Sequence, residues 1–191
     1  MLDISAALHC LDGSWQVHVV AVKNEVKEVL LLSSFNSKFI THGSICAVDV
    51  EEGWQFEFTQ EEEDNATCHL LPTTCHLSPA TYLYEPNAAI LKAGAYKLVG
   101  ARYGLYKLDA NTHLYYSEQL VQDFPGRIFK IAQKDISHDV RGGQYNVLTR
   151  NYVMGAEELK KKLKVRDGGN QFIIGARHNG KPIMLICDRI K

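Results

Sequence analysis

The sequence has little of what marks several specialised protein classes. Its 191 residues include only 5 Pro and 14 Gly, which excludes collagen-like and Pro/Gly-rich disordered chains. The 5 Cys are odd in number and scattered, so they do not form a disulfide framework and instead fit a reducing compartment. The apolar runs at 17–22, around His18, and at 29–32 are too short to span a bilayer. With no signal-peptide pattern at the N-terminus, we expect a cytoplasmic protein without a membrane partner.

Basic residues are scarce in the first third of the chain. Residues 1–66 contain three Lys/Arg against twelve Asp/Glu, a net charge of −9. Residues 67–191 contain eighteen against ten, a net charge of +8, so the two parts together give the formal −1. This split predicts that the second part favours an anionic partner and that the first part repels it.

Complete cofactor and metal motifs are also missing. No Gly-x-Gly-x-x-Gly, Gly-x-x-x-x-Gly-Lys or Asp/Asn-Pro-Pro-aromatic string occurs. The pairs Cys68-His69 and Cys75-His76 offer four potential zinc ligands. Adjacent residues do not readily turn both side chains to one ion, and the spacing matches no standard zinc module. We therefore predict no metal site and no catalytic residue in this chain.

Apolar spacing predicts a mixture of helices and strands. The first part is expected to contain helices at 4–11 and 25–32, a strand at 15–22, and a hairpin of strands 44–50 and 54–60. The strand at 15–22 is apolar on both faces, as in the interior of a covered sheet. The acidic run 61–65 and residues 67–79 have no periodicity and are interpreted as a linker.

Beyond the linker, Pro86 favours the first turn of a helix that continues through 88–99, with Glu85 at its positive end. Strands are expected at 112–116, 127–131 and 145–149, and a helix at 156–165. Asn179-Gly180 is a strong signal for a hairpin between 171–177 and 182–189.

Several short strings resemble a known family. Residues 17–22 (VHVVAV), 24–25 and 27–28 look like the end of a Rossmann-type, S-adenosylmethionine-dependent methyltransferase domain. Residues 84–94 (YEPNAAILKAG), 111–115, 123–127 and 150–152 are similar to bacterial methyltransferase-like proteins that carry a ferredoxin-like segment and then a THUMP-like domain.

The resemblance implies an α+β fold with a partial Rossmann-type sheet in 1–66, a linker at 67–79, a ferredoxin-like segment at 80–124 and a THUMP-like α/β domain at 125–191. It also implies the C-terminal part of a longer protein. S-adenosylmethionine would bind elsewhere in that parent, so this chain alone would be inactive. A non-enzymatic structural or protein-interaction module is the alternative. If a sheet neighbour is missing, strand 15–22 has an open edge through which a homodimer could form.

THUMP domains are associated with RNA-modifying enzymes, so the resemblance implies an RNA partner such as tRNA or rRNA. Lys and Arg side chains can neutralise phosphates, Tyr rings can stack on bases, and Arg can hold an anion bidentately. Ordinary structural roles, such as a capping residue or a hydrogen-bonded strand histidine, remain open for the same residues. The candidate RNA contacts are Asn87, Lys92, Arg102, His113, Tyr115, Arg127, Arg150, Asn151 and Tyr152.

Overall fold

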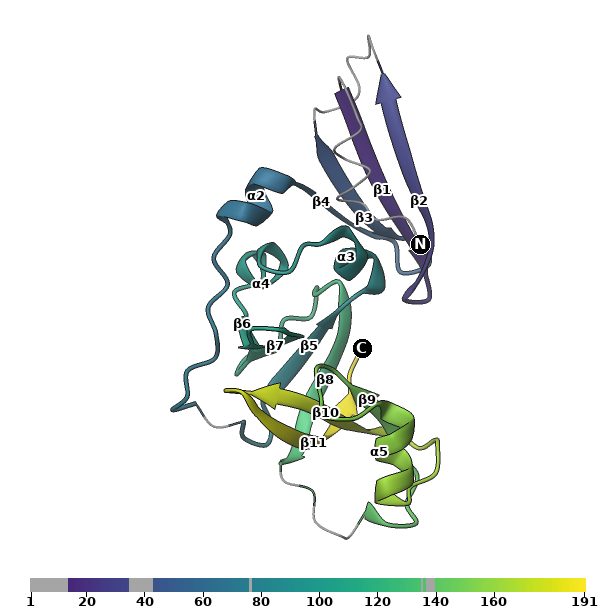
Figure 1. Cartoon of the computed structure of the whole chain (residues 1–191), viewed down its shortest axis with the longest axis vertical. Helices are drawn as coiled ribbons and strands as arrows, with labels where there is room; N and C mark the ends of the chain where they lie inside the picture. Colours follow the sequence, from purple (N-terminus) through teal and green to yellow (C-terminus); the bar gives the residue numbers. More distant parts are fainter. Residues whose placement is uncertain (1–13, 35–42, 76, 135, 137–139) are drawn as a thin grey trace. The chain divides into compact units, whose positions relative to one another are not determined.

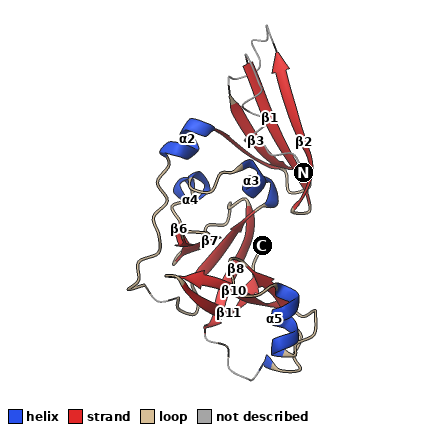
Figure 2. Ribbon diagram, in the orientation of Figure 1, coloured by secondary structure: helices blue, strands red, loops and turns tan. Residues whose placement is uncertain are grey.

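The structure, a computed structural model, describes residues 14–34, 43–75, 77–134, 136 and 140–191 (Figure 1). The chain divides into two compact units, of which unit 1 comprises 1–67 and 86–101 and unit 2 comprises 68–85 and 102–191. The chain therefore passes between the units after Thr67, Glu85 and Ala101. Strands dominate and the helices are short (Figure 2). The helix expected at 4–11 lies outside the described residues.

In the described part of unit 1, four strands form one sheet in the order β2-β1-β3-β4. These strands are β1 (Ser14–Val22), β2 (Glu25–Ser34), β3 (Ser44–Asp49) and β4 (Trp54–Thr59). Strands β1 and β3 run parallel, whereas β1–β2 and β3–β4 are antiparallel. The strand at 15–22 and the following hairpin are thus confirmed.

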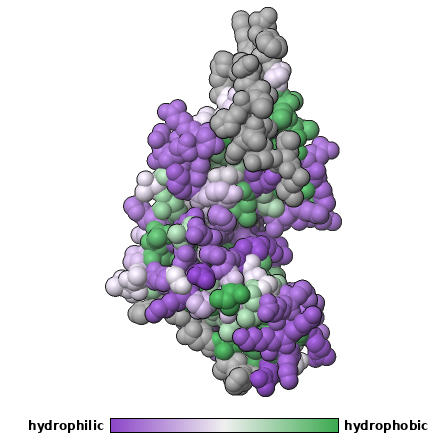
Figure 3. Space-filling view, in the orientation of Figure 1, coloured by the Kyte–Doolittle hydropathy of each residue, from purple (hydrophilic) through white to green (hydrophobic). Residues whose placement is uncertain are grey.

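Strand β2 corrects two expectations. The helix expected at 25–32 is wrong, because Lys23 and Asn24, with φ of 54° and 60°, turn the chain back so that β2 pairs with β1. The open edge expected at 15–22 is also wrong, since β1 pairs with both β2 and β3. Among the described strands, the edges of this sheet are β2 and β4. Strand β2 exposes Leu30, Leu31 and Leu32, and Figure 3 shows hydrophobic side chains over it.

The acidic run assigned to the linker forms helix α2 (Gln60–Asn65) instead. Its first turn is closed by a capping box, in which Glu62 N donates to Thr59 Oγ1 at 3.2 Å and Thr59 N donates to Glu62 Oε2 at 2.7 Å. The buried Glu63 carboxylate accepts the backbone N–H groups of Lys97 and Leu98, both at 2.8 Å. The acidic run therefore has a structural role in unit 1.

A single helix through 88–99 is also wrong. Pro86 ends strand β5 (Tyr82–Pro86), and Asn87 caps the short helix α3 (Ala88–Ala93). Gly94 then adopts φ +90°, a left-handed conformation that stops the helix, and α4 (Leu98–Arg102) forms separately.

In the described part of unit 2, strands form a seven-stranded sheet in the order β6-β7-β5-β8-β11-β10-β9. Besides β5, its elements are β6 (Tyr106–Asp109), β7 (Thr112–Ser117), β8 (Gly126–Lys134), β9 (Asn146–Thr149), α5 (Ala156–Leu163), β10 (Gln171–His178) and β11 (Lys181–Arg189). The expected strands, the helix and the Asn179-Gly180 hairpin are confirmed. Hydrophilic side chains cover α5 (Figure 3).

This sheet is strongly curled. Strands β6 and β10 stand five positions apart in the strand order, which in a flat sheet would separate them by about 24 Å. Nevertheless β10 contacts β6, and Gly180 N beside β10 donates to Asp109 Oδ2 in β6 at 2.8 Å. The sheet is therefore an incomplete barrel around a shared apolar core, which includes Leu83, Leu108, Leu114, Phe129, Ile174 and Leu185.

No helix among the described residues is long and apolar enough to cross a bilayer. In the same residues, no three His, Cys, Asp or Glu side chains gather as metal ligands. Of the two Cys-His pairs, Cys68 donates its thiol to Leu105 O at 3.5 Å, and His76 lies outside the described residues.

Candidate functional site

A buried carboxylate between two arginines is the most organised polar feature of unit 2. Glu85 in β5 is 1% exposed. Its Oε2 accepts from Arg127 Nε at 2.6 Å and also contacts Arg127 Nη2, while Arg150 Nη2 lies 2.5 Å from Oε1. Arg127 therefore does hold a carboxylate, but the carboxylate belongs to the protein. The placement of Glu85 at a helix end is wrong, because it lies in a strand and forms these ion pairs.

The curl of the sheet brings the two arginines together. Strand β8, which begins beside Arg127, is the neighbour of β5 in the sheet, whereas Arg150 follows the edge strand β9. The Arg150 backbone N–H donates to Gly175 O at 2.9 Å, which fixes this segment against β10. The two arginine side chains remain 22% and 36% exposed. Each guanidinium therefore keeps donors for a ligand while Glu85 holds its orientation.

Two further basic side chains belong to this region. Burial lowers the pKa of His113 below its ordinary value, and the positive charges of Lys107 and Arg150 lower it further. These charges therefore act on one imidazole, which is neutral at pH 7. The basic cluster of unit 2 comprises Lys107, His113, Arg127 and Arg150. At its border, Asn151 Nδ2 lies 3.5 Å from Thr112 Oγ1.

The Arg150→Gln substitution is expected to raise the pKa of His113, because it removes one of the two cations that disfavour the imidazolium. Burial still holds the pKa below its ordinary value, so the increase is partial. A depressed histidine pKa also means that stability falls as the pH drops through the unfolded-state value near 6.5. NMR titration of the imidazole checks the shift. The exposed Arg166→Gln is the control, and an unchanged pKa in Arg150→Gln would contradict the assigned cause.

Burial removes two of the candidate RNA contacts from the surface. Tyr115 is 0% exposed, so its ring has no free face for a base. Asn87 is 1% exposed, caps α3 by accepting from Ala89 N at 2.9 Å, and donates to Asp49 Oδ2 at 2.8 Å. Both side chains therefore act within the fold.

The other candidates are spread over both units. Tyr152 is half-buried and packs over Gly175, where a Cβ would lie 3.0 Å from its ring. Lys92 lies half-buried on α3 in unit 1, and Arg102 is exposed at the end of α4. Residue type and spacing alone do not indicate Lys107 or the role of Glu85. For Glu85, the sequence offers one signal, which is a single carboxylate within the otherwise uncharged stretch 82–86.

Asp49 shows whether unit 1 could hold the adenosyl group of a methyl donor. A carboxylate at the end of a sheet strand is the group that usually binds ribose hydroxyls. Asp49 ends β3 but is 0% exposed. Its Oδ1 accepts from Glu51 N and Glu52 N at 3.1 Å, and its Oδ2 accepts from Asn24 N and Asn87 Nδ2. Asp49 is thus committed to the fold and does not fit the donor.

Comparison with known proteins gives the domain content. Residues 82–125 match a ferredoxin-like domain family, and residues 126–189 match the THUMP domain-like family. The structure described as "Crystal structure of putative methyltransferase from Porphyromonas gingivalis W83" is similar over 100% of this chain, with a TM-score of 0.85 and 33% identity. This chain spans 49% of that protein's length. No curated protein matches. The chain thus has a mixed α+β fold with ferredoxin-like and THUMP-like domains.

Proposed function

We propose that this chain binds RNA through the basic cluster of unit 2 and serves as the RNA-engaging region of an S-adenosylmethionine-dependent RNA methyltransferase. The observation that carries the proposal is the Arg127–Glu85–Arg150 arrangement, with partly exposed guanidinium groups in a chain that has a THUMP-like domain. THUMP domains are associated with RNA-modifying enzymes.

The geometry supports phosphate binding in two ways. The carboxylate of Glu85 orients both guanidinium groups, so less side-chain entropy is lost when a phosphate binds. The two guanidinium groups of Arg127 and Arg150 also carry two positive charges against the single negative charge of Glu85. The excess of one positive charge favours a polyanion.

Methyl transfer enters the proposal through the similar crystal structure, which is described as a "putative methyltransferase". The parallel pairing of β1 and β3 in unit 1 is compatible with a remnant of a Rossmann-type sheet. S-adenosylmethionine would supply the methyl group to an RNA base. Because Asp49 does not fit the donor, we assign no catalytic step to the residues of this chain.

A filter-binding titration of the full chain with a structured RNA, such as a tRNA transcript, tests the proposal. We expect saturable binding at 50 mM salt that weakens about tenfold in Arg150→Ala, because this substitution removes a guanidinium group of the basic cluster that would bind a phosphate. The exposed Lys161→Ala on α5 is the charge-matched control. Absence of binding at low salt would refute the proposed function.

A further inference from the structure

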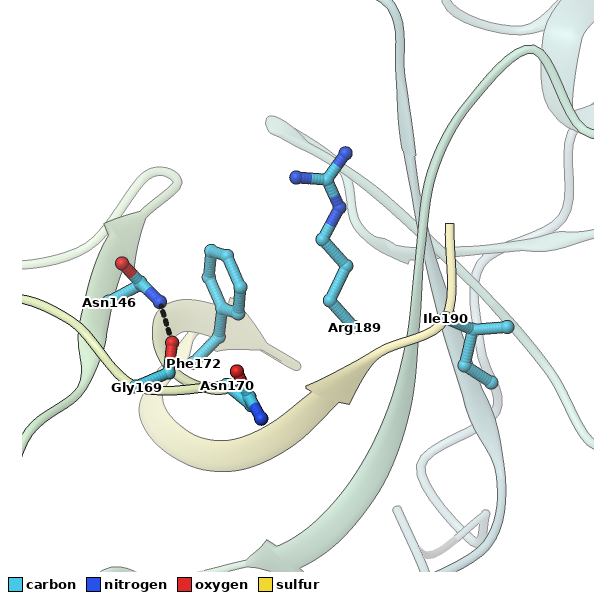
Figure 4. A pocket seen from close by; sticks show the side chains of 6 residues that line it. All are labelled: Asn146, Gly169, Asn170, Phe172, Arg189 and Ile190. Carbon is cyan, nitrogen blue, oxygen red and sulfur yellow. Dashed lines mark hydrogen bonds between the residues drawn. The ribbon is translucent and has the colours of Figure 1, made fainter.

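An open pocket of about 460 Å³ lies at another part of unit 2 (Figure 4). Its size falls within the range of about 300–1,000 Å³ typical of small-ligand sites. The pocket is formed by the starts of β9 and β10 and the end of β11. Its lining residues are Asn146, Gly169, Asn170, Phe172, Arg189 and Ile190.

Phe172 provides a fixed aromatic surface in this pocket. Its ring packs edge-to-face on Phe129, with centroids 5.1 Å apart and an interplanar angle of 61°. Phe129 is fully buried, so it holds the Phe172 ring in place. The guanidinium carbon of Arg127 lies 5.8 Å from the centroid of the same Phe129 ring. The Phe129 ring therefore contacts both Phe172 and Arg127.

The polar side chains around Phe172 have donors and acceptors left for a ligand. Asn146 Nδ2 donates to Gly169 O at 3.0 Å, which fixes the amide while its Oδ1 points away from that bond (Figure 4). Arg189 Nε donates to Lys191 O at 3.0 Å. The N–H groups on Nη1 and Nη2 of Arg189 are left for a ligand. Asn170 adds an exposed amide.

These groups match the parts of one nucleotide. A planar aromatic face stacks on a base, side-chain amides pair with the polar edge of a base, and a guanidinium binds a phosphate. We infer that this pocket binds a single unpaired nucleotide, with the base on Phe172 and the phosphate at Arg189. The inference rests on the proposed function, because it assigns an unpaired nucleotide of the same RNA to this pocket.

NMR titration of the isotope-labelled full chain with the four nucleoside 5′-monophosphates tests the pocket separately from RNA binding. At least one nucleotide is expected to shift the side-chain amide signals of Asn146 and Asn170. Phe172→Leu should weaken this binding about tenfold, since base–aromatic stacking is lost while an apolar side chain is kept. Asn170 is exposed, so Asn170→Ala should leave the fold intact and weaken nucleotide binding as well. Lys162→Gln, at an exposed position of α5 outside the pocket, is the control and should leave the nucleotide affinity unchanged.

The outcomes separate the two claims. Nucleotide binding that depends on Phe172, without binding of structured RNA, would support the pocket and refute the proposed function. RNA binding without nucleotide-induced shifts of the Asn146 and Asn170 amides would support the proposed function and overturn the pocket assignment. Asn146 amide shifts that persist unchanged in both Phe172→Leu and Asn170→Ala would overturn the pocket assignment.

Discussion

A chain carrying both Arg127→Gln and Arg150→Gln is expected to lose about 3–5 kcal/mol of the free energy of unfolding of unit 2. The reason is Glu85, which is 1% exposed and is paired by these two guanidinium groups. Removing both arginines leaves a buried carboxylate without a cationic partner. Each single substitution should cost less, because the remaining arginine still pairs with Glu85.

Urea denaturation followed by far-UV circular dichroism measures this loss. The control is Arg141→Gln with Lys162→Gln, which removes two positive charges at exposed positions of the same unit. Both tryptophans of the chain, Trp15 and Trp54, belong to unit 1, so their fluorescence monitors that unit separately. A loss below about 1 kcal/mol, equal to that of the control, would show that the ion pairs do not stabilise the fold.

The affinity of the full chain for structured RNA is expected to fall about 100-fold when the salt concentration rises from 50 to 200 mM. This estimate assumes that the basic cluster and its surroundings neutralise about four phosphates, each of which releases condensed counterions. Filter binding at five or six salt concentrations gives the slope of log K against log salt.

The variant Arg150→Gln should make this slope shallower by about one, since one phosphate contact is removed. The variant Phe172→Leu changes no charge and should leave the slope unchanged. An affinity that does not depend on salt would contradict phosphate binding by the basic cluster.

Local patterns explain which parts of the fold were predictable from the sequence. The hairpin at Asn179-Gly180 follows from two residues that tolerate positive φ, and they adopt 53° and 72°. Helix α5 follows from its amphipathic spacing. Strand β2 was misassigned because Val26, Val29 and Leu30 have a spacing that fits one helix face as well as a strand. Its pairing with β1 decides between the two.

The candidate site depended on contacts that no local pattern encodes. Residue type indicates that Arg127 and Arg150 bind an anion, but their shared partner Glu85 is 42 residues from Arg127 and belongs to another strand. Only the curl of the sheet brings Arg150 to the same carboxylate. Tyr115 was selected as an aromatic residue near basic ones, yet its position on β7 places it in the interior. Residue type indicated the chemistry, and burial determined which side chains are accessible.

RNA that binds at the basic cluster depends on Arg150 more than on other positive charges at the surface of unit 2. The most direct measurement compares the RNA affinity of Arg150→Gln with that of Lys162→Gln, since both remove one positive charge from unit 2. Loss of a charge-assisted contact at Arg150 is expected to weaken binding about tenfold, whereas Lys162→Gln should change it less than about twofold. Equal effects of the two substitutions would show that RNA does not bind specifically at the basic cluster.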